Sequence, residues 1–273
     1  MLTKKVCAVV AAFAVIILLS AGAFAENEKL GYVKSASGDV SIRKAGSESW
    51  QKISVNTAIF NGDELRSTTG SAAVSFIDGS EIELQRNTNV EVAEEFAKGK
   101  SIRKISLKAG DIKANITSVS GKETQFVTPV AVCGVRGTRL SLSYNPATNS
   151  YSITCEDGSV YLLDPANATE TIVEGGDSIT VTYNAETGEF NVSVTGGEVT
   201  VVVEGNEVTM PSGSQVSFVG NTMTVIEGTV DVNGAPVNAG ETQMLTAASA
   251  TTLGDALSTT PAEKTGEASP SRP

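Results

Sequence analysis

The stretch Asn61–Glu83 reads NGDELRSTTGSAAVSFIDGSEIE, and it decides the fold class. Two runs of alternating apolar and polar residues, Ala72–Ile77 and Ser80–Leu84, flank the dipeptide Asp78-Gly79. Alternation with a period of two is typical of a strand with one buried face. Asp-Gly between two such runs predicts a hairpin closed by a type I′ turn. This stretch therefore predicts antiparallel β-structure.

The same pattern continues outward in both directions. Val and Thr are frequent, and turn residues recur about every 8–12 residues, as in all-β domains. Gly205-Asn206 and Gly220-Asn221 are further turn candidates, and Val92–Gly99 could form one helical turn. The predicted fold is all-β: a jelly-roll-like antiparallel fold or an irregular β-helix stack of hairpins, continued by a second, acidic β module.

A loose unit recurs four times along the chain. Each copy starts with Gly-x-Val and contains a second glycine ahead of a further strand: Gly38 and Gly62, Gly158 and Gly176, Gly197 and Gly213, Gly228 and Gly240. The separation of the two glycines falls from 24 to 18, 16 and 12 residues. A strict solenoid needs a fixed period, so the unequal separations favour stacked hairpins.

A second stretch, Val127–Thr138, reads VTPVAVCGVRGT. Together the two stretches resemble the periplasmic FecR domain, in which a G-D-x-L-R turn, a D-G-S hairpin and a T-P…V-R-G-T segment follow in that order. The resemblance covers roughly residues 38–163. The residues that carry it are Gly62, Asp63, Leu65, Arg66, Asp78, Gly79, Thr128, Pro129, Arg136, Gly137 and Thr138.

The resemblance implies a binding or scaffold module rather than an enzyme. A full FecR regulator, as the family implies, carries a cytoplasmic anti-sigma segment ahead of a membrane helix. Only five residues precede the first apolar run here, so we expect that segment to be absent. We interpret Arg136 as structural, with its guanidinium forking onto a carboxylate or backbone carbonyls to fix the bend into the next strand.

The first 25 residues have the form of a secretory signal peptide. Two lysines precede the apolar run Val6–Leu19, and Ala23 and Ala25 form an A-x-A cleavage site. The competing interpretation is an uncleaved anchor, because about 20 apolar residues can span a bilayer. We expect cleavage, no membrane span in the mature protein, and a periplasmic or secreted location.

Charge divides the chain unevenly. Residues 26–155 carry 16 basic and 14 acidic side chains, whereas residues 156–273 carry 2 basic and 17 acidic ones. The acidic half would repel nucleic acid and anionic lipid, so no nucleic-acid partner is expected. The predicted divisions are a signal peptide (1–25), a FecR-like β domain (26–165), an acidic β-repeat module (166–246) and a disordered tail (247–273).

The chain has no histidine, which excludes Ser-His-Asp and Cys-His catalysis, zinc sites with His ligands and a histidine pH switch. Carboxylate-pair chemistry remains open, and Glu81 and Glu83 share one strand face. Residues two apart on any strand lie about 7 Å apart, so we interpret this pair as solvated. We expect no catalytic residue, no cofactor and no metal site, since calcium-loop patterns are also absent.

Cys133 and Cys155 are predicted to form a disulfide. A hairpin that pairs Tyr144 with Tyr151 places Cys155 opposite Leu140, on the apolar face. An oxidising compartment would favour the bridge, and closing this loop would contribute about 3 kcal/mol. Two buried free thiols are the alternative.

One basic cluster stands out in this acidic protein. Its members are Lys98, Lys100, Arg103, Lys104, Lys108 and Lys113. The cluster is either a site for an anionic partner or an edge strand whose lysines prevent unwanted pairing, and we favour the edge strand.

Three functions follow from these observations. The first is an exported, non-catalytic FecR-domain protein that acts as a binding or scaffold module in the cell envelope, with an envelope protein or surface component as its partner. The second is a ligand-sensing subunit that works with a separate membrane signalling regulator. The third, which a single Trp disfavours, is an enzyme acting on carbohydrate.

Overall fold

The computed structural model describes residues 28–97, 99–164, 169–184 and 186–246. Its regular elements are 24 strands, and every pairing with a defined register is antiparallel. The predicted all-β class and the stack of hairpins are therefore confirmed. Val92–Gly99, considered as a helical turn, begins instead within a strand. Within the described residues, no helix is long and apolar enough to cross a membrane.

The described chain divides into two compact units between Phe126 and Val127. The predicted boundary at residues 165–166 falls on a segment outside the described residues, and it stays a prediction. The predicted signal peptide and C-terminal tail also lie outside the described residues.

The first unit consists of two sheet layers. Its strands are β1 Lys29–Ser37, β2 Val40–Arg43, β3 Trp50–Lys52, β4 Ala58–Phe60, β5 Asp63–Ser67, β6 Ser71–Phe76, β7 Glu81–Leu84, β8 Thr88–Ala97, β9 Lys100–Asn115 and β10 Lys122–Val127. Layer 1A has the order β4-β1-β6-β7-β9, and layer 1B has the order β3-β2-β5-β8-β9. Strand β10 also pairs with β9.

Strand β9 belongs to both layers because it bends at Gly110. Residues before the bend pair with β8, and residues after it pair with β7. Gly110 has a φ of 92°, and a Cβ there would lie 2.5 Å from both the Asn87 carbonyl oxygen and the Thr88 Cα. Glycine alone fits this bend, since other residues are strained at such φ values and the backbone leaves no room.

The second unit also has two layers. Its strands are β11 Val132–Val135, β12 Arg139–Asn145, β13 Ser150–Asp157, β14 Ser159–Asp164, β15 Thr169–Glu174, β16 Ser178–Asn184, β17 Glu189–Gly196, β18 Glu198–Val203, β19 Asn206–Pro211, β20 Gln215–Val219, β21 Thr222–Glu227, β22 Thr229–Val232, β23 Ala235–Asn238 and β24 Thr242–Met244. Layer 2A has the order β12-β13-β16-β17-β20-β21-β24. Layer 2B has the order β11-β14-β15-β18-β19-β22-β23.

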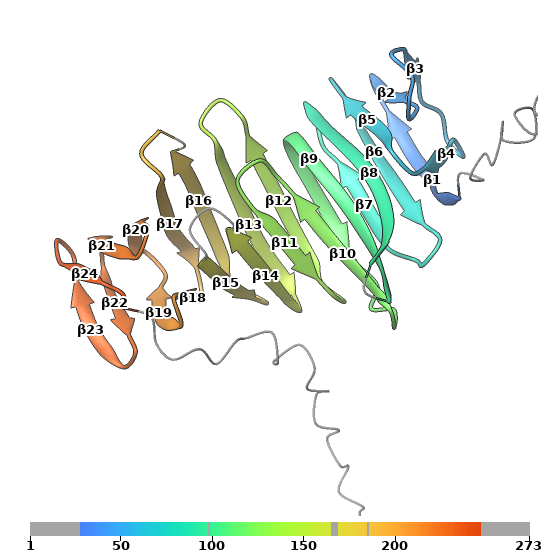
Figure 1. Cartoon of the computed structure of the whole chain (residues 1–273). Helices are drawn as coiled ribbons and strands as arrows, with labels where there is room; N and C mark the ends of the chain where they lie inside the picture. The colour runs from blue at the N-terminus through green and yellow to red at the C-terminus, as the bar shows by residue number, and fades with distance from the viewer. Residues whose placement is uncertain (1–27, 98, 165–168, 185, 247–273) are drawn as a thin grey trace, which may run out of the picture. The chain divides into compact units, whose positions relative to one another are not determined.

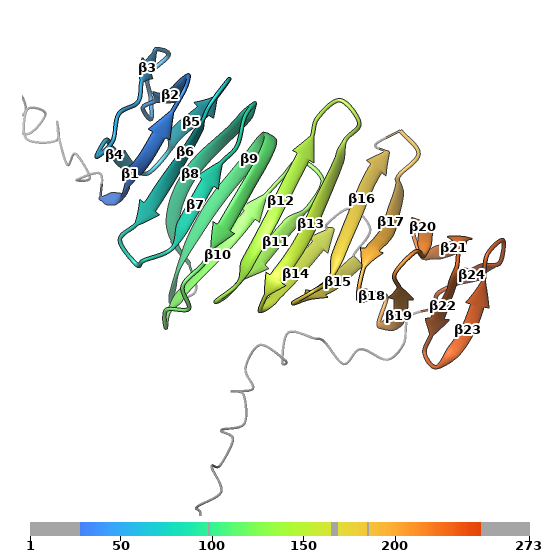
Figure 2. The same ribbon diagram turned by 180° about the vertical axis from the view of Figure 1, so that it is seen from behind.

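Successive hairpins of the second unit alternate between its layers. The hairpin β12-β13 lies in layer 2A, β14-β15 in layer 2B, and β16-β17 in layer 2A again. Figures 1 and 2 show this alternation continuing through β18-β19, β20-β21 and β22-β23. Each hairpin therefore pairs with the hairpins before and after it in its own layer.

The glycines of the predicted repeat mark the places where the chain changes layer. All eight have positive φ, from 71° to 100°. In the second unit, the first glycine of each copy leads from layer 2A to layer 2B, and the second leads back. The repeat read from the sequence is thus a repeat of layer changes.

The return turns of the second unit share one set of hydrogen bonds, which we call the latch. At Gly176-Asp177, the glycine N–H donates to the Cys155 carbonyl at 2.8 Å, and the Cys155 N–H donates to the Asp177 carbonyl at 3.0 Å. The Asp177 carboxylate also accepts the Glu174 N–H at 3.0 Å. The same two backbone bonds recur between Gly213-Ser214 and Val194, and between Gly240-Glu241 and Val225.

Each latch also has a polar side chain that bonds to the residue three positions earlier. The Ser214 hydroxyl donates to the Pro211 carbonyl at 2.6 Å, and the Glu241 carboxylate accepts the Asn238 N–H at 2.7 Å. Backbone groups withdrawn from the strand ladders thus keep partners, as buried groups must.

The tight turns agree with the sequence in position but not always in type. Asp78-Gly79 does connect β6 to β7, but only Gly79 has positive φ, so the predicted type I′ turn is wrong. Asp78 instead accepts the Ser80 N–H at 3.0 Å. The hairpin turns at Gly205 and Gly220 are confirmed, with two-residue loops.

Alternate residues of each strand form the cores. On β13, Tyr151, Ile153 and Cys155 are buried, whereas Ser152 and Thr154 face outward. The core of the second unit is rich in valine and includes Phe190 and Phe218, whose ring centroids lie 6.5 Å apart. β-Branched side chains suit such flat, half-buried strands.

Gly110→Ala should destabilise the protein more than Gly121→Ala. Both glycines have positive φ, which costs alanine about 1–2 kcal/mol. A Cβ at Gly121 meets no atom within 4 Å, whereas at Gly110 it overlaps backbone, which should add about 1–3 kcal/mol. Urea denaturation measures both free energies of unfolding. Equal losses for the two variants would contradict the proposed close approach at the β9 bend.

Candidate functional site

The G-D-x-L-R motif forms the turn into β5. Gly62 has a φ of 80°, and Leu65 is fully buried in the core. Asp63 is 1% exposed, and its carboxylate accepts the Phe60 N–H at 2.9 Å and binds the Lys44 ammonium at 2.7 Å. The aspartate of the motif therefore closes the turn that the glycine permits.

Arg66, the last residue of that motif, points the other way. Its side chain is exposed, and its guanidinium carbon lies 4.2 Å from the centroid of the Trp50 ring. Trp50 also contacts the Arg43 guanidinium, at 5.3 Å. Within the described residues, Arg66 has no carboxylate partner, so this arginine is not part of the turn's own framework.

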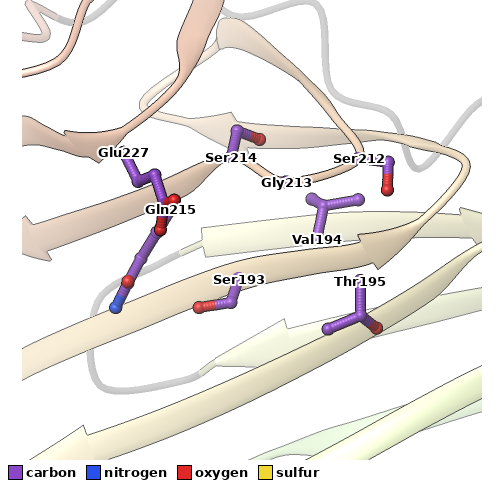
Figure 3. A pocket seen from close by; sticks show the side chains of 8 residues that line it. All are labelled: Ser193, Val194, Thr195, Ser212, Gly213, Ser214, Gln215 and Glu227. Atoms are coloured by element: carbon purple, nitrogen blue, oxygen red, sulfur yellow. The ribbon is translucent and has the colours of Figure 1, made fainter.

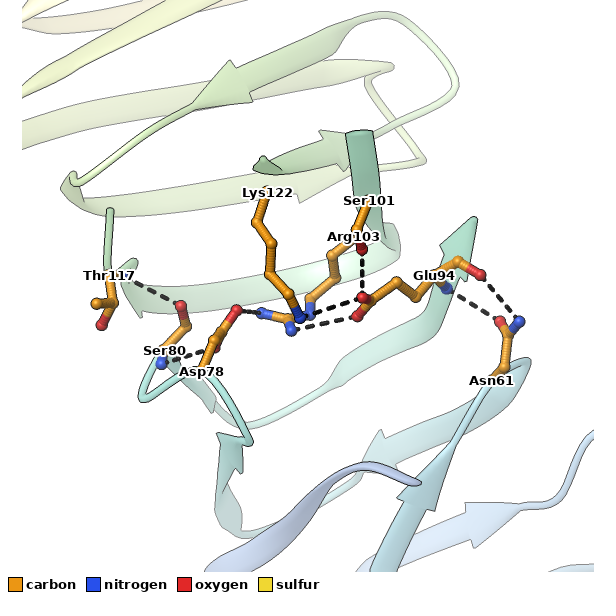
Figure 4. A network of polar contacts seen from close by, with 8 residues as sticks. All are labelled: Asn61, Asp78, Ser80, Glu94, Ser101, Arg103, Thr117 and Lys122. Atoms are coloured by element: carbon orange, nitrogen blue, oxygen red, sulfur yellow. Dashed lines mark hydrogen bonds and ion pairs between the residues drawn. The ribbon is translucent and has the colours of Figure 1, made fainter. Parts of the chain in front are cut away.

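The D-G-S hairpin is tied to a buried ionic network in the first unit (Figure 4). Arg103 is 2% exposed, and its guanidinium binds Asp78 at 2.8 Å and Glu94 at 3.3 Å. The ring centroid of Phe76 lies 4.1 Å from the same guanidinium. Glu94 also binds Lys122 at 3.3 Å and accepts a hydrogen bond from the Ser101 hydroxyl.

Both carboxylates of this network are held in the charged form. Burial alone would raise the pKa of Asp78, but the Ser80 N–H and the Arg103 guanidinium lower it below its ordinary value. Burial opposes ionisation of Glu94 too, and the Ser101 hydroxyl with Arg103 and Lys122 holds its pKa below the ordinary value. The network is therefore internally neutralised and offers no group poised for acid or base catalysis.

The T-P and V-R-G-T segments lie at the start of the second unit. Thr128 closes the turn that contains Pro129, since its N–H and hydroxyl donate to the Ala131 carbonyl at 2.9 and 3.1 Å. Gly137 has a φ of 67°, and the buried Thr138 hydroxyl donates to the Ser159 carbonyl at 3.0 Å. These residues fix the chain around β11 and β12.

The structural role expected for Arg136 stays a prediction. The side chain is exposed and, among the described residues, makes neither the carboxylate contact nor the carbonyl contact predicted for it. Gly137, with its positive φ, and the Thr138 hydroxyl, which bonds to the Ser159 carbonyl, hold the bend.

The predicted basic cluster is distributed along β9. Arg103 lies in the buried network, Lys104 binds Glu95 at 2.6 Å, and Lys108 binds Glu91 at 2.9 Å. Strand β9 pairs with other strands on both sides, so the favoured edge-strand interpretation is wrong. Lys98 lies outside the described residues. Carboxylates neutralise most of this cluster, which removes the reason to assign it an anionic partner.

The predicted Cys133–Cys155 disulfide is not formed. The hairpin behind the prediction is correct, because Tyr144 pairs with Tyr151 and Leu140 with Cys155. Both cysteines are nevertheless free, and both are buried. Cys133 lies on β11 in layer 2B, whereas Cys155 lies on β13 in layer 2A.

A shallow hollow of about 330 Å³ lies beside one latch of the second unit (Figure 3). It is lined by Ser193, Val194, Thr195, Ser212, Gly213, Ser214, Gln215 and Glu227. The lining offers hydroxyls, one amide and one carboxylate. In the part of the chain that the structure describes, no group of three or more Cys, Asp or Glu residues could hold a metal ion.

Sequence reasoning missed the Trp50–Arg66 contact and the burial of Arg103. The two residues of the first pair lie on separate strands, and only the order of strands in layer 1B brings them together. The sequence offered one signal for this contact, namely that the single Trp of the chain lies between Arg43 and Arg66.

Arg103→Met should destabilise the protein far more than Lys104→Met. Removing Arg103 leaves Asp78 and Glu94 without their shared cation, which for buried pairs costs about 3–5 kcal/mol. Lys104 binds Glu95 at the surface, where a pair contributes about 0–1 kcal/mol. Chemical denaturation at neutral pH compares the two variants, and similar losses would contradict the role of the network.

The wild-type protein should also lose stability in acid. The pKa values of Asp78 and Glu94 are lower in the folded than in the unfolded state, so their contribution is complete above the unfolded values, near pH 4. This stabilisation is lost as the pH falls through the lower pKa values that the two carboxyl groups have in the folded protein. Thermal melting across this range measures the loss, which Arg103→Met should reduce.

Cys133 and Cys155 should resist iodoacetamide in the native protein. Burial raises the pKa of the Cys133 thiol, and burial with nearby carboxylates such as Asp177 raises that of Cys155. Thiolates are the reactive form, so both should be alkylated only after unfolding in urea, without reductant. Mass spectrometry of digests reads out each site. If alkylation of the unfolded protein required a reductant, the cysteines would be joined in a disulfide and this prediction would be contradicted.

Comparison with known proteins adds a family assignment for part of the chain. Residues 63–161 match the family model described as FecR protein. No curated protein matches the chain. Two crystal structures of a candidate anti-sigma factor from Parabacteroides distasonis ATCC 8503, at 1.65 and 2.50 Å resolution, are similar to it.

Each of these structures is 19% identical to the chain, with a TM-score of 0.41, over 48% of this chain and 59% of that chain. The chain thus matches about three-fifths of the length of these structures. So distant a likeness supports no inference about activity. The family match lies within the region that the sequence motifs indicated, and on that match the chain contains a FecR domain.

Proposed function

We propose that this protein is an exported, non-catalytic binding or scaffold module of the cell envelope. The observation that carries the proposal is that the buried charged side chains are all engaged in structural contacts. The charged side chains that are buried among the described residues are Asp63, Glu64, Asp78, Arg103 and Asp177. Each one holds a turn or neutralises another charge, so none is left for chemistry.

The carboxylate pair considered for catalysis fits this proposal. Glu81 binds Lys34 at 2.6 Å on the outer face of layer 1A, and Glu83 is exposed next to it. Both residues lie on an open sheet face. A glycosidase needs its two acids to flank a bound sugar.

The architecture supports binding through its outer faces. On layer 2A, outward residues form rows across the strands, such as Ser143, Ser152, Thr180, Ser193 and Gln215. Hydroxyls and amides both donate and accept hydrogen bonds, and such a face suits polar partners. The alternative function, a ligand-sensing subunit that works with a separate membrane regulator, rests on the FecR match alone.

In-cell photo-crosslinking tests the proposal. A photoreactive residue is placed at the outward positions Glu83 and Thr154, and at Ala147 in a loop as a control. We expect envelope proteins or surface components to be captured from the two sheet faces in preference to the loop. N-terminal sequencing of the same preparation should find a chain that starts near Glu26, outside the cytoplasm.

The outcomes separate the candidate functions. A membrane signalling regulator as the main captured protein would replace the scaffold with the sensing subunit. Cytoplasmic partners, or a chain that keeps its first 25 residues in the cytoplasm, would contradict both.

A further inference from the structure

A row of polar donors crosses the outer face of layer 1B. Lys52 on β3 lies opposite Ser41 on β2, Ser41 lies opposite Arg66 on β5, and Arg66 lies opposite Asn89 on β8. Directly opposite residues share one face of a sheet. Three strand spacings of about 4.8 Å make this donor row about 14 Å long.

The neighbouring row on the same face is already neutralised. It runs from Trp50 through Arg43 and Glu64 to Glu91. Arg43 binds Glu64, and Lys108 binds Glu64 at 3.2 Å and Glu91 at 2.9 Å. Burial alone would raise the pKa of Glu64, but hydrogen bonds from Arg43, Asn89 and Lys108 hold it below its ordinary value.

The donor row, in contrast, has no negative charge. Lys52 and Arg66 are both exposed, and among the described residues neither has a carboxylate partner. The two cations are separated by the Ser41 hydroxyl. At the end of the row, the Asn89 side chain is hydrogen-bonded to Glu64 of the neighbouring row, and its oxygen is buried. Two unpaired cations next to a balanced row form a local site for negative charge.

Trp50 holds Arg66 ready for such a ligand. The guanidinium lies over the indole ring at 4.2 Å, an arrangement that favours the cation and restricts its motion. Stacking occupies a face of the planar guanidinium, and the N–H groups along its edge stay free to bind an oxyanion in bidentate fashion.

We propose that the donor row binds an acidic saccharide, with a sugar carboxylate on Arg66. The proposal deepens the binding role proposed above and rests on it. Ser41 stands between the two cations, and its hydroxyl can both donate to and accept from a sugar hydroxyl. A polyphosphate would instead favour a cation at every step. Trp50 lies beside the row with Arg66 over its ring, so its fluorescence should respond when a ligand binds that guanidinium.

Fluorescence titration tests the proposal directly, because Trp50 is the only tryptophan of the chain. The probe is the trimer of galacturonic acid, and the controls are maltotriose, which has no charge, monomeric galacturonate and tripolyphosphate. We expect the acidic trimer to shift the emission, with the neutral trimer silent and both other anions at least tenfold weaker. Higher salt should weaken the binding.

Two variants locate the site, and one matched variant controls for charge. Arg66→Gln and Lys52→Gln should each weaken binding of the acidic trimer at least tenfold. Arg86→Gln removes an exposed arginine of the same unit outside the donor row and should leave binding unchanged. All three residues are exposed, so unchanged melting temperatures will show that the variants fold.

Each contrary result overturns the proposal in its own way. If monomeric galacturonate bound as tightly as the trimer, the donor row would be a site for a single oxyanion. If tripolyphosphate bound more tightly than the trimer, the donor row would be a phosphate site. Unchanged binding by Arg66→Gln would place the ligand elsewhere. None of these results affects the crosslinking test, so failure here is distinct from failure of the envelope module.

Discussion

The second unit depends on one constraint: wherever the chain leaves a sheet layer, its backbone groups must still find partners. Positive φ at the repeat glycines turns the chain, and the latch returns two hydrogen bonds that the ladders cannot supply. At Gly176, Gly213 and Gly240 the same bond from the glycine N–H recurs, at 2.8 Å each time. Local turns, more than side-chain packing, therefore set where hairpins alternate.

The same need for hydrogen-bond partners explains the acidic residue that follows a repeat glycine. Asp63 and Asp177 occupy equivalent places after Gly62 and Gly176, and each accepts an N–H from three residues earlier. Lys44 neutralises Asp63, whereas Asp177 accepts the backbone N–H groups of Glu174 and Glu198 and, within the described residues, forms no ion pair. In the G-D-x-L-R motif the aspartate thus builds the turn, and the arginine is left free to face outward.

The sequence predicted the local structure well and the spatial relations poorly. Alternation correctly placed Cys155 opposite Leu140, but alternation identifies a face and not a layer, so the bridge to Cys133 failed. Charge patterns likewise could not show that Arg103 is buried between two carboxylates. Trp50 and Arg66 meet only because β2 lies between their strands, and this order of strands depends on pairings between distant residues.

Alternating hairpins also affect how this fold can change in length. Within the described residues, successive hairpins of one layer pair with each other, so interactions are nearly one-dimensional, and stability is close to a sum over repeats. Inserting or removing a hairpin from each layer would leave every remaining register intact. Evolution can therefore lengthen or shorten such a protein in steps of two hairpins, and so vary its reach without redesigning its core.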